Sequence, residues 1–325
     1  MDKKKVYVTR RIPNEAIKLL EKHFDVEINP RDRVLLKVEL LEKVKGKDAV
    51  LCLLTDNIDK EVLEAAGARC KIFANYGVAC NNIDMLVATQ RGVIITNTPE
   101  VLDDATADLA WTLLMVVSRR IVAADKFTRN GAFESCDPMM FLGKKITGTT
   151  LGLVGAGPIG FNFAKKAKAF DMKILYTDLI RNYEMEKELG AIYVDKDTLL
   201  KNADFVSLHV PLLPSTTHYI SDREFSIMKN TSVIVNTCSG PVIDEKALVK
   251  ALKQGEIWGA GLDVFEYEPN IEPELLNMYN VVIVPHISSA TMETRTNMGL
   301  IAAESIIKVL CGKKPDSCVN IEVLK

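Results

Sequence analysis

The stretch TLGLVGAGPIG, residues 150 to 160, decides how this chain folds. An apolar run that is typical of a buried strand ends in a glycine-rich turn, and the helical pattern FNFAKKAKAF follows at once. In that context a GxGxxG motif predicts a dinucleotide site, because Gly155 allows the tight turn, Gly157 admits a pyrophosphate and Gly160 lets the helix approach the strand. The start of the helix directs free N–H groups at the phosphates. The expected phosphate loop is Gly155-Ala156-Gly157-Pro158-Ile159-Gly160.

The next apolar run, KILYTD, ends at Asp178, 18 residues after Gly160. A carboxylate at that position accepts hydrogen bonds from the adenosine ribose and repels a 2′-phosphate, so the sequence favours NAD (NADH) over NADP. Arg181, three residues on, keeps NADP open as a less favoured cofactor. A glycine-rich turn followed by an unrelated surface aspartate is the competing interpretation, but it does not explain the order of strand, motif, helix, strand and aspartate.

Short apolar runs alternate with helical patterns on both sides of this motif, which indicates parallel sheets covered by helices on both faces. The fold class expected is α/β, with two Rossmann-like, doubly wound domains, one flavodoxin-like and one NAD-binding. We assign residues 1–100 and 290–325 to a substrate-binding domain and residues 101–289 to an inserted NAD-binding domain. One long helix from 103 to 131 is expected to connect them, and a last helix at about 292–310 is expected to lead back.

Composition limits the class of protein. The chain has 325 residues, 48% hydrophobic and 26% charged, with a net charge of −2, which favours a soluble two-domain protein and not a nucleic-acid or membrane binder. We find no secretory signal and no run of membrane-spanning length. Seven cysteines without a CxxC pair suggest neither a zinc site nor a disulfide framework, and a cytoplasmic location is expected.

Later strand ends carry the groups that suggest chemistry. In an open parallel sheet the ligand lies at the carboxyl ends of the strands, and His286 follows one such end while Glu268 lies in the loop after the preceding strand. A carboxylate that pairs with a histidine fixes its tautomer and favours its protonated form. A lone histidine is more often a structural residue, but the cofactor motif and Glu268 favour a proton carrier for hydride transfer. His209 is expected to line the cofactor pocket, and His218 to be solvated.

Five segments in this order resemble the D-isomer-specific 2-hydroxyacid dehydrogenases, and most closely the glyoxylate and hydroxypyruvate reductase branch. The resemblance covers nearly the whole chain. The segments are TNTPEVLDDATADLAW, GLVGAGPIG, SLHVPLLPSTTHYI, GAGLDVFEYEP and VPHISSATMETR.

The resemblance implies specific roles for these residues. It makes His286 the acid/base and Glu268 its partner, and it implies a homodimer joined through the coenzyme domain. It assigns the small 2-keto or 2-hydroxy acid to a loop in which Val78 and Ala79 offer N–H groups beside Leu54. It implies that the cofactor contacts Thr106, His209, Val210, Pro211, Thr237, Cys238, Asp263 and Ser288.

One departure from the family pattern concerns the strand end NTCSG. Where the family has an arginine that holds the substrate carboxylate and keto oxygen, this chain has Ser239, with Asn236 and Gly240 in register around it. A guanidinium makes bidentate, charge-assisted bonds that a hydroxyl cannot make. A second departure, Cys80 and its neighbours, affects the substrate loop. A nucleophilic role for Cys238 is disfavoured, because nothing in the sequence suggests an activated thiolate.

Three hypotheses follow. The first is an NAD(H)-dependent 2-keto acid reductase of low activity. The second is an NAD(H)-binding sensor or partner-binding dimer without turnover. In the third, Ser239 was introduced to trap a complex. Within the first, an arginine such as Arg10 or Arg11 could replace the missing cation.

Overall fold

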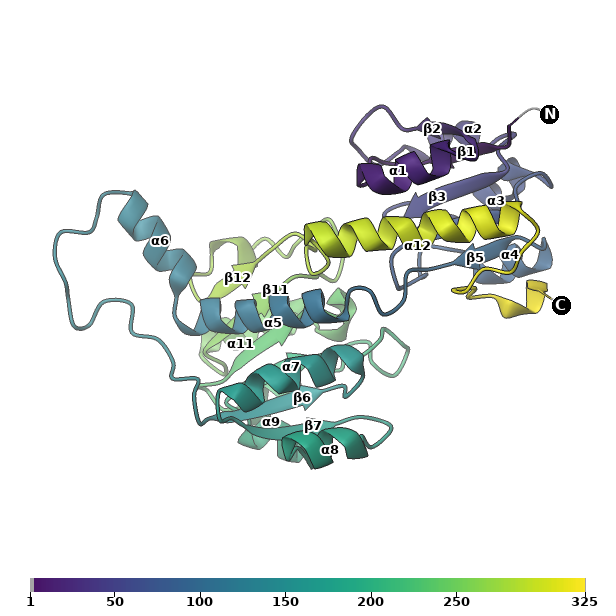
Figure 1. Ribbon diagram of the computed structural model, residues 1–325. Helices are drawn as coiled ribbons and strands as arrows, with labels where there is room; N and C mark the ends of the chain where they lie inside the picture. The colour runs from purple at the N-terminus through teal and green to yellow at the C-terminus, as the bar shows by residue number, and fades with distance from the viewer. Residues whose placement is uncertain (1–2, 325) are drawn as a thin grey trace. The chain divides into compact units, whose positions relative to one another are not determined.

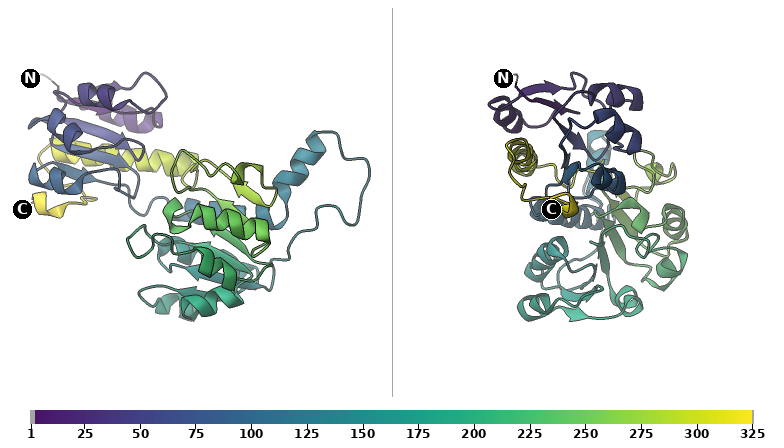
Figure 2. Two further views of the ribbon diagram at one scale, coloured as in Figure 1. Left: turned by 180° about the vertical axis from the view of Figure 1, so that it is seen from behind. Right: turned by 90° about the vertical axis from the view of Figure 1, so that its right-hand side faces the viewer.

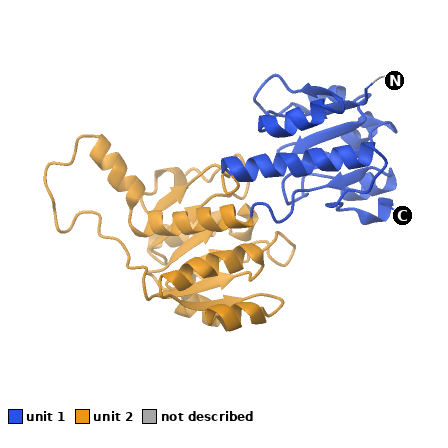
Figure 3. Cartoon of the chain, viewed as in Figure 1, with its two compact units in different colours: residues 1–102, 290–325 blue, residues 103–289 orange. Residues whose placement is uncertain are grey.

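The computed structural model describes residues 3–324 and divides the chain into two compact units (Figure 3). Unit 1 comprises residues 1–102 and 290–325, and unit 2 comprises residues 103–289. The division lies within two residues of the boundaries expected from the sequence.

Unit 1 is built on five parallel strands in the order β2-β1-β3-β4-β5, the order of flavodoxin-like sheets (Figure 1). Helices α1 and α12 pack on one face, while α2, α3 and α4 supply the apolar side chains of the other. Because both faces are covered, the inner strands are continuous apolar runs. The elements are β1 (Lys5–Val8), α1 (Asn14–Glu21), β2 (Asp25–Ile28), α2 (Lys37–Lys43), β3 (Ala49–Leu53), α3 (Lys60–Ala66), β4 (Ile72–Tyr76), α4 (Met85–Gln90), β5 (Ile94–Thr96), α12 (Met292–Leu310) and the short η3 (Ile321–Leu324).

Unit 2 is built on seven parallel strands in the order β12-β11-β10-β9-β6-β7-β8, of which β12, β11, β6 and β7 are labelled in Figure 1, and Figure 2 shows the unit from two further sides. Helices α5 and α7 cover one face, and α9, α10 and α11 cover the other. The direction of strand order reverses between β6 and β9, which is where such sheets bind ligands. The elements are α5 (Asp103–Ser118), α6 (Ile121–Arg129), β6 (Thr150–Val154), α7 (Pro158–Ala169), β7 (Lys173–Thr177), α8 (Tyr183–Leu189), β8 (Ile192–Tyr193), α9 (Lys196–Asn202), β9 (Phe205–Leu208), α10 (Asp222–Ile227), β10 (Val233–Asn236), η1 (Gly240–Val242), α11 (Glu245–Gln254), β11 (Gly259–Leu262), η2 (Leu275–Asn277) and β12 (Val281–Ile283).

The single helix expected from 103 to 131 is wrong, because the structure contains two helices there. Helix α5 ends at Ser118 and α6 starts at Ile121, with Arg120 between them in the left-handed region at φ 54°. A left-handed residue cannot continue the helical hydrogen-bond ladder. The Arg120 guanidinium lies 5.1 Å from the centre of the Tyr279 ring, a tertiary contact that a helical sequence pattern does not reveal.

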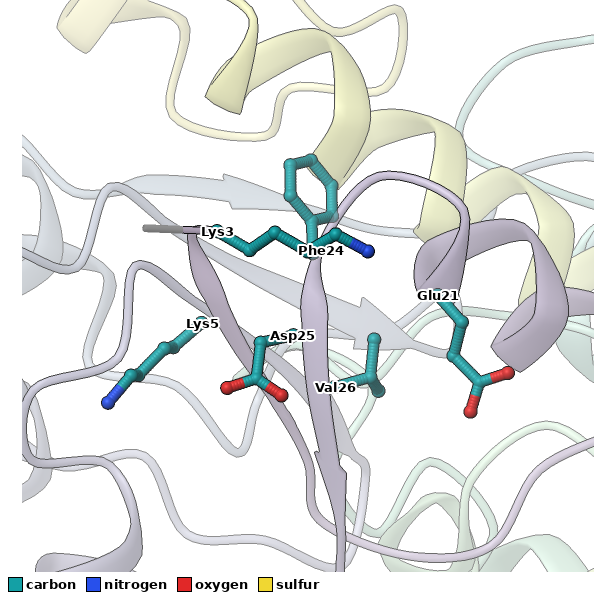
Figure 4. Close-up of a pocket in the computed structure, with 6 residues that line it drawn as sticks. All are labelled: Lys3, Lys5, Glu21, Phe24, Asp25 and Val26. Carbon is teal, nitrogen blue, oxygen red and sulfur yellow. The ribbon is translucent and has the colours of Figure 1, made fainter. Parts of the chain in front are cut away.

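Two short strands, β2 and β8, are absent from the sequence-based expectation. Both lie at the edges of their sheets, and β8 has only two residues, both exposed. A shallow pocket opens beside β2, lined by Lys3, Lys5, Glu21, Phe24, Asp25 and Val26 (Figure 4). It lies at the amino ends of β1 and β2, the edge opposite to the one where sheets of this type bind ligands. Between residues 3 and 324, no helix combines the length and apolarity needed to cross a membrane.

Candidate active site

The strands of unit 2 end level with one another at their carboxyl edge. The register places side by side the last residues Val154, Thr177, Leu208, Asn236, Leu262 and Ile283. The next residue of each strand therefore emerges at the same edge, in the order Gly155, Asp178, His209, Thr237, Asp263 and Val284. Five of these six belong to the set that the sequence assigned to the cofactor.

The glycine loop at this edge requires glycine for two different reasons. A Cβ on Gly155, which has φ 98°, would lie 2.4 Å from the carbonyl oxygen of His209, and a Cβ on Gly160 would lie 2.2 Å from the oxygen of Gly155. A Cβ on Gly157 would meet no atom within 4 Å. Gly157 therefore borders open space at the start of α7, where the first N–H groups of the helix have no partner within it. This is the space that a phosphate group would occupy.

Asp178 and its neighbours hold the loop from outside. The Asp178 carboxylate accepts a hydrogen bond from the Ala156 N–H at 2.6 Å, and the Asn182 side chain donates to the Ala156 oxygen at 2.7 Å. Arg181 is held in a two-pronged ion pair with Glu186, with nitrogen–oxygen distances of 2.6 and 3.0 Å. Glu186 therefore competes with any phosphate group for the Arg181 guanidinium.

Three buried polar atoms in unit 2 lack a hydrogen-bond partner within residues 3–324: Thr106 Oγ1, His209 Nδ1 and Thr237 Oγ1. Thr106 lies in the first turn of α5, which starts at the end of unit 2 toward which the strands point (Figure 1). Burial lowers the pKa of His209 to about 3, so its ring is neutral, and its Nε2 lies 2.8 Å from the Ser207 hydroxyl. An unpaired buried polar atom costs about 1–3 kcal/mol, which a bound polar ligand would recover. The open cradle and the three unpaired atoms fit a nicotinamide dinucleotide.

His286 and Glu268 form the predicted pair, with His286 Nδ1 2.8 Å from Glu268 Oε2. Because a carboxylate only accepts hydrogen bonds, Nδ1 carries the proton in this contact. Burial alone would raise the pKa of Glu268, but the hydrogen bond and charge of His286 bring that pKa below its ordinary value. The other oxygen of Glu268 accepts a hydrogen bond from the Phe265 N–H at 3.0 Å.

Asp263 fixes the backbone on which His286 stands. His286 has φ 53°, a left-handed conformation that is strained for a residue with a side chain, and its N–H donates to the Asp263 oxygen at 2.9 Å. The Asp263 carboxylate accepts from the Ile287 and Ser288 N–H groups at 2.6 and 2.9 Å. The pKa of Asp263 is raised by its burial. Asp263 thus positions the His286 loop, a contact that the sequence assignment near nicotinamide did not include.

Ser239 lies directly beside the loop that carries Glu268. Its half-buried hydroxyl makes no hydrogen bond within the described chain, while its carbonyl oxygen accepts from the Asn236 side chain at 2.9 Å. A Cβ on Gly240 would lie 1.8 Å from the Phe265 oxygen, so the two loops are in backbone contact. The structure therefore places the Ser239 loop against the backbone of Phe265 and Glu266, at the start of the loop that carries Glu268.

Cys238 and the residues after β9 line the same edge. Burial raises the pKa of the Cys238 thiol to about 11, against a smaller opposite effect of the Val210 N–H, so this cysteine is a neutral thiol. That agrees with a pocket residue and argues against a nucleophile. The Pro211 oxygen accepts a hydrogen bond from the Thr216 hydroxyl at 2.7 Å, which fixes the turn after β9.

The three proposed substrate residues lie in unit 1, at the ends of neighbouring strands β3 and β4. The carbonyl oxygens of Val78 and Ala79 accept hydrogen bonds from Asn97 and Asn75 at 2.9 and 2.7 Å. Their N–H groups donate to no acceptor in the part of the chain described here, so they could bind an anion. The Leu54 side chain is 38% exposed.

Sequence reasoning did not foresee the supporting role of three residues, one of which, Asn236, it had named only for its register with Ser239. Asn236 and Asn182 hold backbone oxygens of the Ser239 and glycine loops, and Glu245 holds the loop of Glu268. A buried asparagine at a strand end is a sequence signal that could have identified Asn236. Glu245 gives no such signal. Glutamate is common in the first turn of a helix because its negative charge interacts favourably with the positive end of the helix dipole.

Comparison with known proteins places this arrangement among hydroxyacid dehydrogenases. Residues 111–288 match the family model described as the NAD binding domain of D-isomer specific 2-hydroxyacid dehydrogenase. A glyoxylate reductase of Thermococcus litoralis is 49% identical over 99% of this chain and 98% of its own length. The crystal structure of a glyoxylate reductase from Paecilomyes thermophila aligns with a TM-score of 0.86 at 32% identity, covering 98% of this chain and 99% of that one.

A further solved structure bears on the cofactor. It is an NADPH-dependent glyoxylate/hydroxypyruvate reductase from Sinorhizobium meliloti in complex with NADP and malonate, which aligns with a TM-score of 0.84 at 28% identity. The alignment covers 99% of this chain and 98% of that one. The matched family model and this solved structure both indicate a nicotinamide cofactor. Similar proteins differ in whether NAD or NADP is named as that cofactor.

Proposed function

Since the chain belongs to the D-isomer-specific 2-hydroxyacid dehydrogenases, we propose that it reduces a small 2-keto acid of the glyoxylate or hydroxypyruvate type to the D-2-hydroxy acid with NADH. The observation that carries this proposal is the 2.8 Å contact between His286 and Glu268, which creates an oriented proton donor at the carboxyl edge of the sheet.

The residues supply the proton and the electrostatics of the reaction. A bound reduced nicotinamide supplies the hydride to the carbonyl carbon. His286 Nε2 gives its proton to the carbonyl oxygen, so one hydride and one proton complete the alcohol. The carboxylate of Glu268 stabilises the imidazolium before transfer, and Asp263 keeps the loop of His286 in place.

NADH is proposed as the preferred cofactor. The carboxylate of Asp178 stands at the end of β7, where it would meet the adenosine ribose. Arg181 is the nearby cation that could favour a 2′-phosphate, and it is already paired with Glu186. Both features support discrimination against NADPH.

Low activity toward keto acids is proposed as a consequence of Ser239. The N–H groups of Val78 and Ala79, with Leu54, are proposed to bind the substrate carboxylate. In unit 2, Ser239 supplies a neutral hydroxyl at the position where the family pattern has an arginine. Arg10, a candidate substitute, is engaged by Asp32 at 3.1 Å. We expect slow turnover rather than none, because the proton donor His286 and its partner Glu268 are both present.

A homodimer joined through unit 2 is also proposed. Helix α6 and the loop after it extend away from the rest of that unit (Figures 1 and 2), and none of the residues of α6 is buried. The exposed apolar side chains there are Ile121, Val122, Phe133, Met139 and Leu142. Apolar exposure of this extent is typical of an interface. A cytoplasmic location is proposed because the seven cysteines are all free.

The test is NADH oxidation over a panel of 2-keto acids that includes glyoxylate and hydroxypyruvate, beside a direct NADH titration. His286→Ala should abolish turnover and leave the NADH dissociation constant nearly unchanged, while His23→Ala, a substitution at an exposed histidine, serves as the control. NADH binding without oxidation by any keto acid would favour the sensor hypothesis instead. Full activity of His286→Ala would remove His286 from the mechanism.

A further inference from the structure

The loop that carries Glu268 makes two short-range hydrogen bonds, from the Asn270 N–H to the Tyr267 oxygen at 2.8 Å and from the Phe265 N–H to Glu268 Oε1 at 3.0 Å. The residues from Tyr267 to Asn270 are exposed, and Tyr267 is 67% exposed. A segment with little buried apolar surface is held mainly by its hydrogen bonds. The position of the Glu268 carboxylate against His286 therefore depends on these short-range bonds and on the anchors at the two ends of the loop.

Both ends are anchored by one buried side chain from outside the loop. Glu245, the first residue of α11 and 6% exposed, accepts the Glu266 N–H on Oε1 at 2.5 Å and the Glu272 N–H on Oε2 at 3.1 Å. In return, the Glu266 carboxylate accepts the Glu245 N–H at 3.2 Å. The two oxygens of Glu245 thus span residues 266–272, with Glu268 between the anchored points.

The surroundings of this contact are strongly acidic. His218 is exposed, as the sequence suggested, and it also donates a hydrogen bond to Glu266 at 2.8 Å, with Asp244 lying 3.9 Å from the other nitrogen of that ring. Burial is the main cause of the raised pKa of Glu245, and the charges of Glu266 and Glu272 add to it. Placing three carboxylates together is unfavourable, and the hydrogen bonds to the loop N–H groups offset that cost.

We propose that Glu245 is a positioning residue for the reaction, which fixes both ends of the 266–272 loop so that Glu268 meets His286. Glu245 touches neither reactant nor cofactor in this role. It acts through Glu268, and the inference deepens the proposed function and rests on it.

The test follows the titration of the His286 ring by NMR, which needs no turnover. The chain has four histidines, and the signal is assigned by its loss in His286→Gln. Glu245→Gln replaces one acceptor oxygen by an NH₂ group that cannot accept a loop N–H. Since a neighbouring carboxylate raises a histidine titration midpoint by about 1–3 pH units, partial loss of the contact should lower the midpoint by roughly half a unit or more.

Two comparisons separate positioning from general stability. The control is Glu224→Gln. Glu224 is another buried glutamate in the first turn of a helix, and it accepts the Ser221 N–H at 3.2 Å. This substitution should lower Tm without moving the His286 midpoint. In a Glu268→Gln background, adding Glu245→Gln should move the midpoint no further, because the two residues act through one contact.

An unchanged midpoint in Glu245→Gln, or a shift of equal size in the Glu268→Gln background, would overturn the proposal. If Glu245→Gln does not fold, Glu245→Asp must give a smaller shift in the same direction, since its shorter side chain reaches only one of the two N–H groups. Failure of the unmodified protein to oxidise NADH with any keto acid would refute the proposed function and leave this titration to be decided separately.

Discussion

Replacing Ser239 by arginine should raise kcat/KM for glyoxylate or hydroxypyruvate. Ser239 has an extended backbone with φ −159° and ψ 137°, which any residue adopts, so arginine fits without backbone strain. Its carbonyl oxygen is held by Asn236, and Gly240 stays packed on Phe265. The new side chain would therefore start from a fixed point beside the loop of Glu268.

The size of the effect follows from the exchange of one interaction for another. A neutral hydroxyl contributes about 1 kcal/mol net, and Ser239 has no partner that it would lose within residues 3–324. A buried charged contact to substrate is worth about 2–5 kcal/mol. With about 1.4 kcal/mol for each factor of ten, we expect a gain of roughly 30-fold or more.

The assay is steady-state NADH oxidation for the unmodified protein, Ser239→Arg and Ser239→Met. Methionine adds bulk without charge and therefore controls for crowding. A drop in kcat/KM for Ser239→Arg, in a protein that still folds and binds NADH, would contradict the missing-cation hypothesis. An equal gain for methionine would show that packing, and not charge, limits the reaction.

Three further predictions concern the cofactor and the catalytic pair. Asp178→Ala should narrow the gap between the NADH and NADPH dissociation constants, whereas equal constants in the unmodified protein would show that Asp178 does not face the ribose. Glu186→Gln should release Arg181 and tighten NADPH binding while NADH binding changes little, measured by the same titrations; unchanged NADPH affinity would argue against Arg181. Glu268→Gln should lower Tm at pH 7, with the difference shrinking as pH falls below about 5. The sign follows from the pKa of Glu268, which is lower in the folded state than its ordinary value. Such a carboxylate stabilises the fold at a pH above its pKa in the unfolded state. That stabilisation is lost as pH falls through the pKa of the folded state. A difference that stays constant down to pH 3 would exclude the pairing with His286 as its source.

Local patterns located the groups that act within one segment. The glycine loop could be recognised because its glycines, the preceding strand and the following helix are contiguous, and the clashes at Gly155 and Gly160 explain why the pattern is needed. The strand-end positions of Glu268 and His286 suggested a pair, the resemblance assigned the same two residues, and the structure shows the contact. Spacing alone cannot show such a contact, since 18 residues separate the two.

Other features were outside the reach of the sequence. The break at Arg120 is accompanied by a contact with Tyr279 from a distant part of the chain, and β2 and β8 are short strands at the edges of their sheets. Arg181 looked available to a 2′-phosphate because its partner Glu186 is indistinguishable from any helix-surface glutamate until the chain folds.

The sequence by itself determined the fold class and the neutral residue at position 239, and it predicted the dinucleotide site, because each depends on residue type and on short, contiguous patterns. Tertiary structure alone decided that Asp263 holds the loop of His286, that Glu245 anchors the loop of Glu268, and that the Ser239 and Glu268 loops are in contact. The physical reason is that hydrogen bonds between loops form only after the parallel strands align their carboxyl ends. Residue type alone does not distinguish a carboxylate that supports a loop from one that faces solvent. Its position in the folded chain does.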